Sequence, residues 1–347
     1  MWLIEIIGNF APMKKIVNVL FALLMITLTA CENEVELNGE YEETAIVYAL
    51  FDASADTHFV RINKTFLEKG ESALDLAQNP DYTNYDSLKV TLTDLSDASI
   101  VILDRIKKPK DPGVFTSEEN ILYYTTMPLQ VGGNYKLEAE LPDGKIVSAT
   151  TTVINSVDVA RPASNTRVNF ISPSGLSNFY SFRVNYFSDI ARFDVKVFFL
   201  YEEVIDGQYY PRRVEVPVSS INNTRLVTET NFTFDLNVNS FFSTLARKVP
   251  NTTTRKEIKT EDNLVVEVYA ADETLMFYKN VNEPIEGLSQ VQPEYSNVEN
   301  GLGLVASRSF TRVVTQLHEE TVDYLTCDSE VKDRGWIYEL RPTGDCN

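Results

Sequence analysis

The sequence predicts a mainly β protein with two antiparallel β-sandwich domains, because of its length, its short alternating segments and its turn residues. The chain has 347 residues, of which 44% are hydrophobic and 11% aromatic, which is enough for more than one core. Apolar and polar residues alternate in short segments, as expected of strands with one solvated face. Turn sequences such as Pro142-Asp143-Gly144 separate these segments.

The first domain is predicted over residues 45–157. Its clearest strand is Tyr135–Leu141, in which every second residue is apolar. The Asp143-Gly144 turn then returns the chain as a partner strand over Lys145–Val153. Five more strands are expected, at Ile46–Phe51, Phe59–Phe66, Leu88–Leu95, Ile100–Ile106 and Ile121–Thr126. Seven short antiparallel strands are typical of an immunoglobulin-like sandwich.

Between Phe66 and Ser87 the alternation stops, and a long loop is predicted. Loops at the end of a sandwich often carry binding surfaces. The alternative is a plain solvated connection.

The second β domain is predicted over residues 165–325, after a polar, proline-containing boundary at Asp158–Asn169. One or two short helices are expected within it, at Ser240–Lys248 and at Asp272–Val281, where acidic residues occupy the first turn. Its strands are expected at Phe179–Phe187, Phe193–Val204, Tyr209–Val218, Asn231–Val238, Leu264–Ala270 and Leu302–Thr315.

Four aromatic residues lie near the second predicted helix: Tyr269, Phe277, Tyr278 and Tyr295. One interpretation is that they pack in the core. The other is that they form an exposed platform for a sugar, a peptide or a partner protein.

Residues 1–30 are predicted to be an export signal. Lys14 and Lys15 precede the apolar run Ile16–Leu28, which is shorter than the roughly 20 residues that span a bilayer. The run ends in Leu28-Thr29-Ala30-Cys31, which is typical of the lipobox cut by the lipoprotein signal peptidase. The alternative is an ordinary secretory peptide followed by an unrelated cysteine. We expect Met13, directly before the lysines, to be the true initiator.

Lipidation of Cys31 would anchor the protein, with residues 31–44 as an acidic tether. The chain has 50 acidic and 31 basic residues and a net charge of −19, which repels nucleic acid and anionic lipid head groups. Burial of each acyl methylene contributes about 0.8 kcal/mol, so two or more chains hold a protein firmly despite this charge. We therefore expect a membrane partner through the lipid and no nucleic-acid partner.

Residues 326–347 are predicted to form a carboxyl-terminal tail that contains the other two cysteines. Cys327 and Cys346 either form a disulfide or remain as free thiols. The disulfide is favoured in an exported chain.

No catalytic, metal or cofactor site is predicted. The two histidines, His58 and His318, are far apart, and neither belongs to a metal-binding pattern. Gly301-x-Gly303 lacks the third glycine of a dinucleotide fingerprint, and no nucleophile elbow or phosphate loop occurs. Two alternatives stay open, a carboxylate pair suited to glycoside hydrolysis and calcium binding by clustered Asp and Asn, because sequence cannot show either geometry.

The segment Tyr295–Ser307 resembles the carboxyl-terminal signature of family 4249 of the domains of unknown function. The residues that carry the resemblance are Tyr295, Asn297, Asn300, Gly301 and Gly303. The hairpin around Asp143-Gly144 is similar to the amino-terminal hairpin of that family. The resemblance implies a Bacteroidota outer-membrane lipoprotein, often encoded beside a TonB-dependent receptor, and brings no catalytic residues. The backbone freedom of Gly and the turn-forming capacity of Asn favour a structural role for the motif.

The leading hypothesis is a non-catalytic, lipid-anchored outer-membrane module, on either the periplasmic or the extracellular face. It would bind a ligand or work with a TonB-dependent transporter in nutrient uptake. The alternative is an adhesin or structural cell-envelope protein, and a surface hydrolase is the third hypothesis.

Overall fold

The computed structural model describes residues 42–68, 71–117, 120–163, 166–187, 189–219, 230–282, 295–338 and 346. The predicted signal peptide, Cys31 and most of the acidic tether lie outside the described residues. The chain from Glu43 to Asn347 forms one compact unit. This unit is mainly β, with several antiparallel sheets and few short helices, as the sequence predicts.

The largest sheet in the described part of the chain has ten strands, in the order β19-β16-β13-β17-β18-β1-β2-β6-β5, with β14 paired to β13. Two of its pairings are parallel, β1 with β18 and β16 with β19, and the others are antiparallel. Its strands are β1 (Ala45–Phe51), β2 (His58–Lys64), β5 (Asp104–Lys107), β6 (Ile121–Thr125), β13 (Arg192–Ile205), β14 (Gln208–Val216), β16 (Lys256–Ile258), β17 (Leu264–Ala271), β18 (Leu302–Thr315) and β19 (Trp336–Tyr338).

Three smaller sheets complete the described β structure. A four-stranded sheet has the order β4-β3-β7-β8, a three-stranded sheet has the order β15-β12-β9, and β10 pairs with β11. Their strands are β3 (Lys89–Asp94), β4 (Ile100–Ile102), β7 (Asn134–Glu140), β8 (Ile146–Thr152), β9 (Asp158–Arg161), β10 (Ile171–Ser172), β11 (Gly175–Leu176), β12 (Phe179–Asn185) and β15 (Asn231–Asn237).

The helices in the described part of the chain are short. They are α2 (Ala73–Gln78), α3 (Pro80–Thr83), α4 (Val238–Lys248), α5 (Glu273–Asn282), α6 (Glu319–Asp323) and the π-helical turn η3 (Tyr324–Asp328). In α4 the Asn237 side chain accepts a hydrogen bond from the Ser240 backbone N–H at 2.8 Å, which caps the helix. Phe241 and Leu245, one turn apart, place one face of α4 in the core.

The described residues form two hydrophobic cores. The first is a sandwich between the sheet of β3 and β7 and the strands β1, β2 and β6, and it includes Phe51 and Tyr135. The second lies between β12 and β15 on one side and β13 and β17 on the other, with α4 against it. Val153 belongs to the first core and Ile154 to the second. The change of core therefore falls a few residues before the predicted boundary between the domains.

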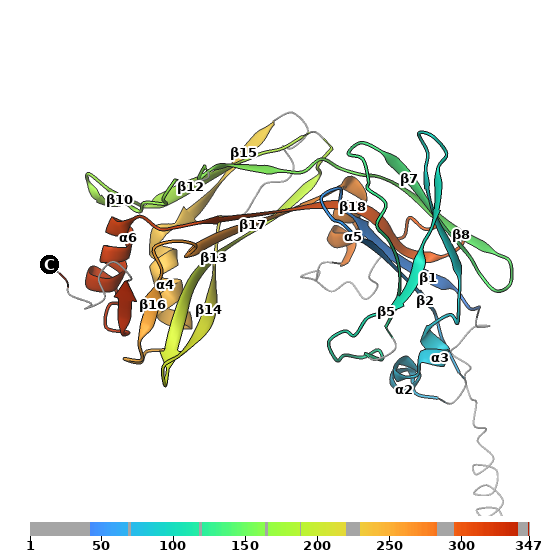
Figure 1. The fold of residues 1–347 in the computed structure, drawn as a ribbon, viewed down its shortest axis with the longest axis horizontal. Helices are drawn as coiled ribbons and strands as arrows, with labels where there is room; N and C mark the ends of the chain where they lie inside the picture. The colour runs from blue at the N-terminus through green and yellow to red at the C-terminus, as the bar shows by residue number, and fades with distance from the viewer. Residues whose placement is uncertain are drawn as a thin grey trace, which may run out of the picture. The chain divides into compact units, whose positions relative to one another are not determined.

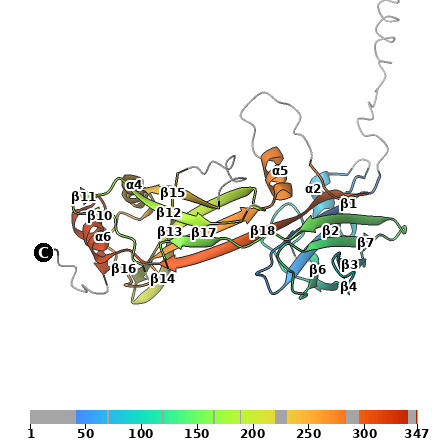
Figure 2. The same ribbon diagram turned by 90° about the horizontal axis from the view of Figure 1, so that it is seen from above.

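Strand β18 belongs to both halves of the large sheet. Leu302–Ser307 pairs in parallel with β1, and Arg308–Thr315 pairs with β17 (Figures 1 and 2). Val305 accordingly lies in the first core, and Val313 packs against the second. The first core thus contains residues from a strand about 150 positions beyond the predicted end of its domain.

The predicted long loop at 66–87 is wrong in part, because α2 and α3 form within it. Asn79 accepts a hydrogen bond from the Asp81 N–H at 3.0 Å, and Pro80 occupies the first turn of α3. The predicted boundary also contains a strand, β9. In the predicted tail, Trp336 and Tyr338 of β19 belong to the second core.

Gly303 permits the parallel pairing of β18 with β1. Its φ is +117°, a backbone conformation that other residues rarely adopt. A Cβ at this position would overlap the carbonyl oxygen of Val47 and lie 2.9 Å from the Val47 nitrogen. The two backbones therefore approach more closely than any side chain allows.

We expect Gly303→Ala to lower the free energy of unfolding by about 4 kcal/mol, since backbone strain and overpacking add at this position. Gly144→Ala is the matched control. Gly144 also has positive φ, at +83°, but nothing lies within 4 Å of its added Cβ, so we expect a loss of about 1–2 kcal/mol there. Urea unfolding monitored by fluorescence measures both. Equal losses in the two variants would contradict the close approach of β18 to β1.

Candidate functional site

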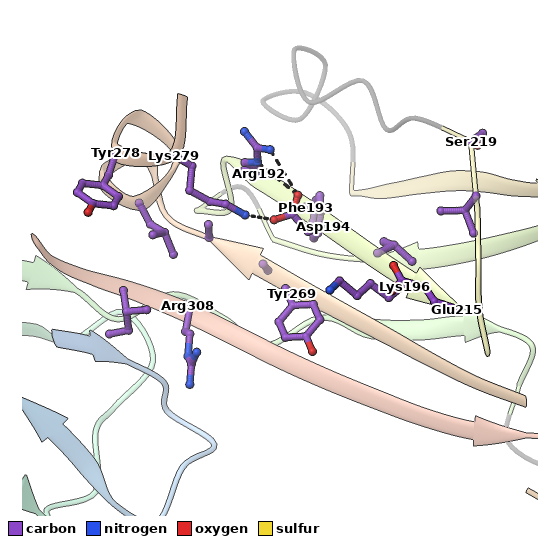
Figure 3. Close-up of a pocket in the computed structure, with 16 residues that line it drawn as sticks. Arg192, Phe193, Asp194, Lys196, Glu215, Ser219, Tyr269, Tyr278, Lys279 and Arg308 are labelled. Atoms are coloured by element: carbon purple, nitrogen blue, oxygen red, sulfur yellow. Dashed lines mark hydrogen bonds and ion pairs between the residues drawn. The ribbon is translucent and has the colours of Figure 1, made fainter. Parts of the chain in front are cut away.

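The candidate functional site is an open hollow of about 840 Å³ beside α5, here called the α5 groove. Strands β13 and β17 form its floor, and α5 stands at one side (Figure 3). Its lining is rich in charged and aromatic side chains. The lining residues are Leu50, Arg192, Phe193, Asp194, Val195, Lys196, Glu215, Val218, Ser219, Tyr269, Ala270, Ala271, Leu275, Tyr278, Lys279 and Arg308.

Ion pairs join the floor of the groove to α5. Lys279 of α5 donates to the carboxylate of Asp194 on β13, and the Arg192 Nε lies 3.4 Å from the other Asp194 oxygen (Figure 3). Arg192 also donates to the side-chain oxygen of Asn280 at 2.9 Å. These contacts hold the helix on the strand, and partial exposure keeps each of them weak.

The groove has more positive than negative charge. Lys196 and Arg308 are exposed, and neither forms an ion pair with the described residues. Together with Arg192 and Lys279 they face two lining carboxylates, Asp194 and Glu215. Such a surface favours a partner or ligand with acidic groups.

The four aromatic residues singled out in the sequence lie outside both cores. Tyr269 and Tyr278 line the groove, and Phe277 is 43% exposed. The Phe277 ring lies 6.2 Å from that of Tyr295. The interpretation of core packing is therefore wrong for these residues: Phe277 is exposed, and Tyr269, Tyr278 and Tyr295 are partly buried at the surface.

Two tyrosines have hydroxyl groups with a raised pKa: Tyr269 lines the groove, and Tyr48 lies outside its lining but contacts Tyr278. Burial, reinforced by the hydrogen bond to Tyr278, raises the pKa of Tyr48 to about 12. Burial and the Glu267 carboxylate, which accepts from the Tyr269 hydroxyl at 2.9 Å, raise the pKa of Tyr269. Both hydroxyls thus stay protonated at neutral pH and can act as hydrogen-bond donors.

Asp272 fixes the start of α5. Its carboxylate accepts from the backbone N–H of Leu275 at 2.7 Å and from that of Ser307 at 2.9 Å. The first bond caps the helix and the second ties it to β18. Burial raises the pKa of Asp272, and the two backbone donors partly offset this rise.

The family model for a domain of unknown function, DUF4249, matches residues 32–312. The chain belongs to this family. The match covers the first core, most of the second core and the α5 groove, and it ends within β18, before the last core residues such as Trp336.

No curated protein matches this DUF4249 chain. Among solved structures, it is similar to fibronectin(III)-like modules of CbhA from Clostridium thermocellum. The sequence identity is 14%, the match covers 78% of this chain and 95% of that chain, and the TM-score is 0.18.

The family motif lies where β18 joins the first core. Asn297 donates to the carbonyl of Val305 at 2.7 Å and accepts from its N–H at 2.9 Å, so its amide replaces a strand neighbour. Asn300 has a φ of 57° and donates to the Ile146 carbonyl at 3.0 Å. A Cβ on Gly301 would lie 2.9 Å from the Ala45 carbonyl oxygen. These contacts give the motif a structural role in this DUF4249 chain.

The cysteines are in two places. Cys327 and Cys346 form a disulfide, 19 residues apart in sequence. Cys31, the predicted lipidation site, lies outside the described residues. In the part of the chain that the structure describes, no helix has the length and apolar character needed to cross a membrane.

The two histidines have separate roles. His58 is 2% exposed, and its Nε2 has no hydrogen-bond partner among the described residues. Burial lowers the pKa of His58, against the opposing charge of Asp52. His318 caps α6 by accepting from the Glu320 N–H at 3.3 Å. Among the described residues, no group of three His, Cys, Asp or Glu side chains could hold a metal ion.

The charged residues of the groove were not singled out from the sequence. Arg192, Asp194 and Lys196 occupy alternate positions on β13, which is a signal of one solvated face. Nothing in the sequence relates this face to Lys279, which lies 85 residues beyond Asp194.

We expect the protein to lose stability as the pH falls below about 6.5, the usual pKa of histidine. The lowered pKa means that His58 binds a proton more weakly in the native state than in the unfolded chain, so acid favours unfolding in this window. His58→Phe fills the site beside the Phe51 ring, which lies 6.1 Å away, and should reduce this pH dependence. Denaturant unfolding at a series of pH values between about 5 and 7.5 measures the pH dependence of the free energy of unfolding for both proteins.

The matched control is His318→Gln, because His318 is the only other histidine of the chain and lies on the surface. The control should keep the pH dependence that His58 causes. The same slope in His58→Phe and in the wild type would contradict the assignment.

Proposed function

We propose that this protein is a non-catalytic, lipid-anchored outer-membrane module of a Bacteroidota bacterium, which binds its target in the α5 groove and works with a TonB-dependent transporter in nutrient uptake. The groove is the observation that carries the proposal. It is open, about 840 Å³ in volume, and lined by tyrosines and by more cations than carboxylates. Such a surface suits recognition of a ligand or partner.

The lipid anchor is supported by the sequence before the described residues. Cys31 follows a short apolar run and small residues, and four acidic or amide side chains follow it, Glu32, Asn33, Glu34 and Glu36. With a net charge of −19, the protein needs hydrocarbon burial to stay at an anionic membrane.

The partnership with a transporter is what the resemblance of Tyr295–Ser307 to the DUF4249 signature implies, and apolar side chains exposed on and near α5 suit a protein partner. Phe277, on α5, is 43% exposed, and Leu50, which lines the groove, is 36% exposed. Aromatic rings next to charged groups are the usual composition of a protein-binding surface.

We expect the native mature protein to begin at Cys31 with acyl chains attached, and to sediment with membranes. Cys31→Ser removes the thiol and should move the protein to the soluble fraction, because roughly 0.8 kcal/mol per buried methylene is lost. Intact-mass analysis and membrane fractionation measure the two effects. An unmodified thiol at position 31, or a mature start elsewhere, would refute the anchor.

We expect a TonB-dependent barrel protein to co-purify with the tagged native protein in mild detergent. Reversing two groove charges together, Lys196→Glu and Arg308→Glu, should lower its recovery about tenfold, because charge complementarity controls association. Quantitative mass spectrometry of the eluate measures this recovery.

The matched control also reverses two charges, Lys89→Glu and Arg183→Glu together, because both residues are exposed, on β3 and β12, and lie outside the groove. The amount of barrel protein that co-purifies with this control variant should equal the amount that co-purifies with the wild type. Absence of any barrel protein would argue against the partnership, and equal loss in both variants would argue against the groove as its site.

A further inference from the structure

A second hollow, of about 400 Å³, lies on the face of β1 and β2 that points away from the first core. Thr65, Phe66, Thr83 and Asn84 form one wall, and Lys110, Phe115, Thr116 and Asn120 form the other. We call it the β2 pocket. Its lining residues are Ile46, Tyr48, Arg61, Asn63, Lys64, Thr65, Phe66, Thr83, Asn84, Lys110, Phe115, Thr116 and Asn120.

The charge of this pocket is opposite to that of the whole protein. Its described lining holds three cations, Arg61, Lys64 and Lys110, and no carboxylate, although acidic residues outnumber basic ones by 50 to 31 in the chain. Lys64 lies 3.6 Å from Glu43. Arg61 and Lys110 form no ion pair with the described residues. Two positive groups thus face the same hollow without a neutralising partner in that part of the chain.

Arg61 and Lys110 are close enough to affect each other. Burial lowers the pKa of Lys110, and the charge of Arg61 lowers it further. The Lys110 ammonium also lies 5.5 Å from the centroid of the Phe115 ring. Like charges in a partly enclosed site raise the free energy of the unliganded protein, and an anion between them removes this repulsion.

The polar walls are held in place by hydrogen bonds. Asn63 donates to the Thr83 carbonyl at 3.0 Å and to the Asn84 side chain at 2.8 Å. Asn120 donates to the Lys108 carbonyl at 3.0 Å. Thr83, Asn84 and Asn120 are all at least nine-tenths buried. The pocket is therefore built before any ligand arrives, which reduces the entropy lost on binding.

The wall opposite α3 is tied to α2. Gln78 donates to the Gly113 carbonyl at 2.9 Å, and the Thr116 N–H donates to the Ala77 carbonyl at 3.2 Å. These bonds bring Phe115 within 6.4 Å of Phe66, ring centroid to ring centroid, with the rings at 78°. Ile46 and Tyr48 add apolar surface from β1. Apolar area and cations therefore line the same small volume.

We propose that the β2 pocket binds a small aromatic carboxylic acid. The carboxylate of this ligand lies between Arg61 and Lys110, and its aromatic ring lies against Phe66 and Phe115. A guanidinium can hold a carboxylate by two parallel hydrogen bonds, which fixes its orientation. The volume suits a single small molecule and excludes a macromolecular anion as its main occupant. This proposal does not depend on the function of the α5 groove.

The test is isothermal titration calorimetry of the full-length protein in mild detergent, with benzoate as the probe and benzamide as its neutral analogue. We expect benzoate to bind about tenfold more tightly than benzamide, since only benzoate has a charge to place between the cations. Raising the salt from about 0.05 M to 0.5 M should weaken benzoate binding through screening.

Arg61→Gln should lower the affinity for benzoate about tenfold, and Arg61→Lys should restore part of it, because the lysine keeps the charge without the planar fork. Arg183→Gln is the matched control. It removes one charge from an exposed arginine on β12, outside the pocket, and should leave binding unchanged. Thermal unfolding of each variant separates a loss of binding from a loss of fold.

Three results would overturn the proposal. They are no benzoate binding by the wild type, equal binding of benzoate and benzamide, or equal loss of affinity in Arg61→Gln and Arg183→Gln. Inorganic sulfate bound as tightly as benzoate would overturn the role assigned to the aromatic rings.

Discussion

The close backbone contact between β1 and β18 is the constraint on which the rest of the structure depends. Strand β1 begins the described chain and β18 comes more than 250 residues later, yet they pair in parallel over Ile46–Phe51 and Leu302–Ser307. Gly303 allows the approach because it has no Cβ to meet Val47. Since β18 continues into its pairing with β17, one strand joins the sheet of the first core to that of the second. Four residues of the family motif lie at this junction, Asn297, Asn300, Gly301 and Gly303.

The same junction positions the α5 groove. Ser307, fully buried in β18, donates through its hydroxyl to the Phe51 carbonyl at 3.1 Å and accepts from the Ile154 N–H at 2.9 Å. Its own N–H donates to Asp272 at the start of α5. Ser307 and its neighbours therefore hold three parts of the chain together. These are strand β1, the segment where the chain passes from the first core to the second, and helix α5 beside the groove. A buried network of this kind is rigid when every group is satisfied, and it sets the helix against the floor formed by β13.

Local patterns in the sequence predicted the strands well and the contacts between distant segments poorly. The expected bounds of β18, Leu302–Thr315, agree with the structure, because a long alternating run depends only on its own residues. The two helices at 66–87 were missed because they are too short for helical periodicity to show. Pairing of β1 with β18 has no local signal, since a parallel partner can come from anywhere in the chain. The groove and the β2 pocket are both formed by such long-range contacts. The sequence therefore shows only that their charged residues lie on solvated faces, and not that they line the same site.

The distribution of charge reconciles an acidic protein with sites for acidic groups. At physiological ionic strength, interactions between charges more than about 8 Å apart are largely screened. The distant charges that make up the net charge of −19 therefore contribute little to the electrostatic potential inside a hollow. Cations that line a partly enclosed surface are screened less and control the local potential. Arg61 and Lys110 in one hollow, and Lys196 and Arg308 in the other, lack ion-pair partners among the described residues. The net acidic charge of the protein repels anionic head groups, while the cations that line the hollows make the local potential more positive there. Selectivity then comes from shape, because only a group small enough to enter a hollow meets its positive lining.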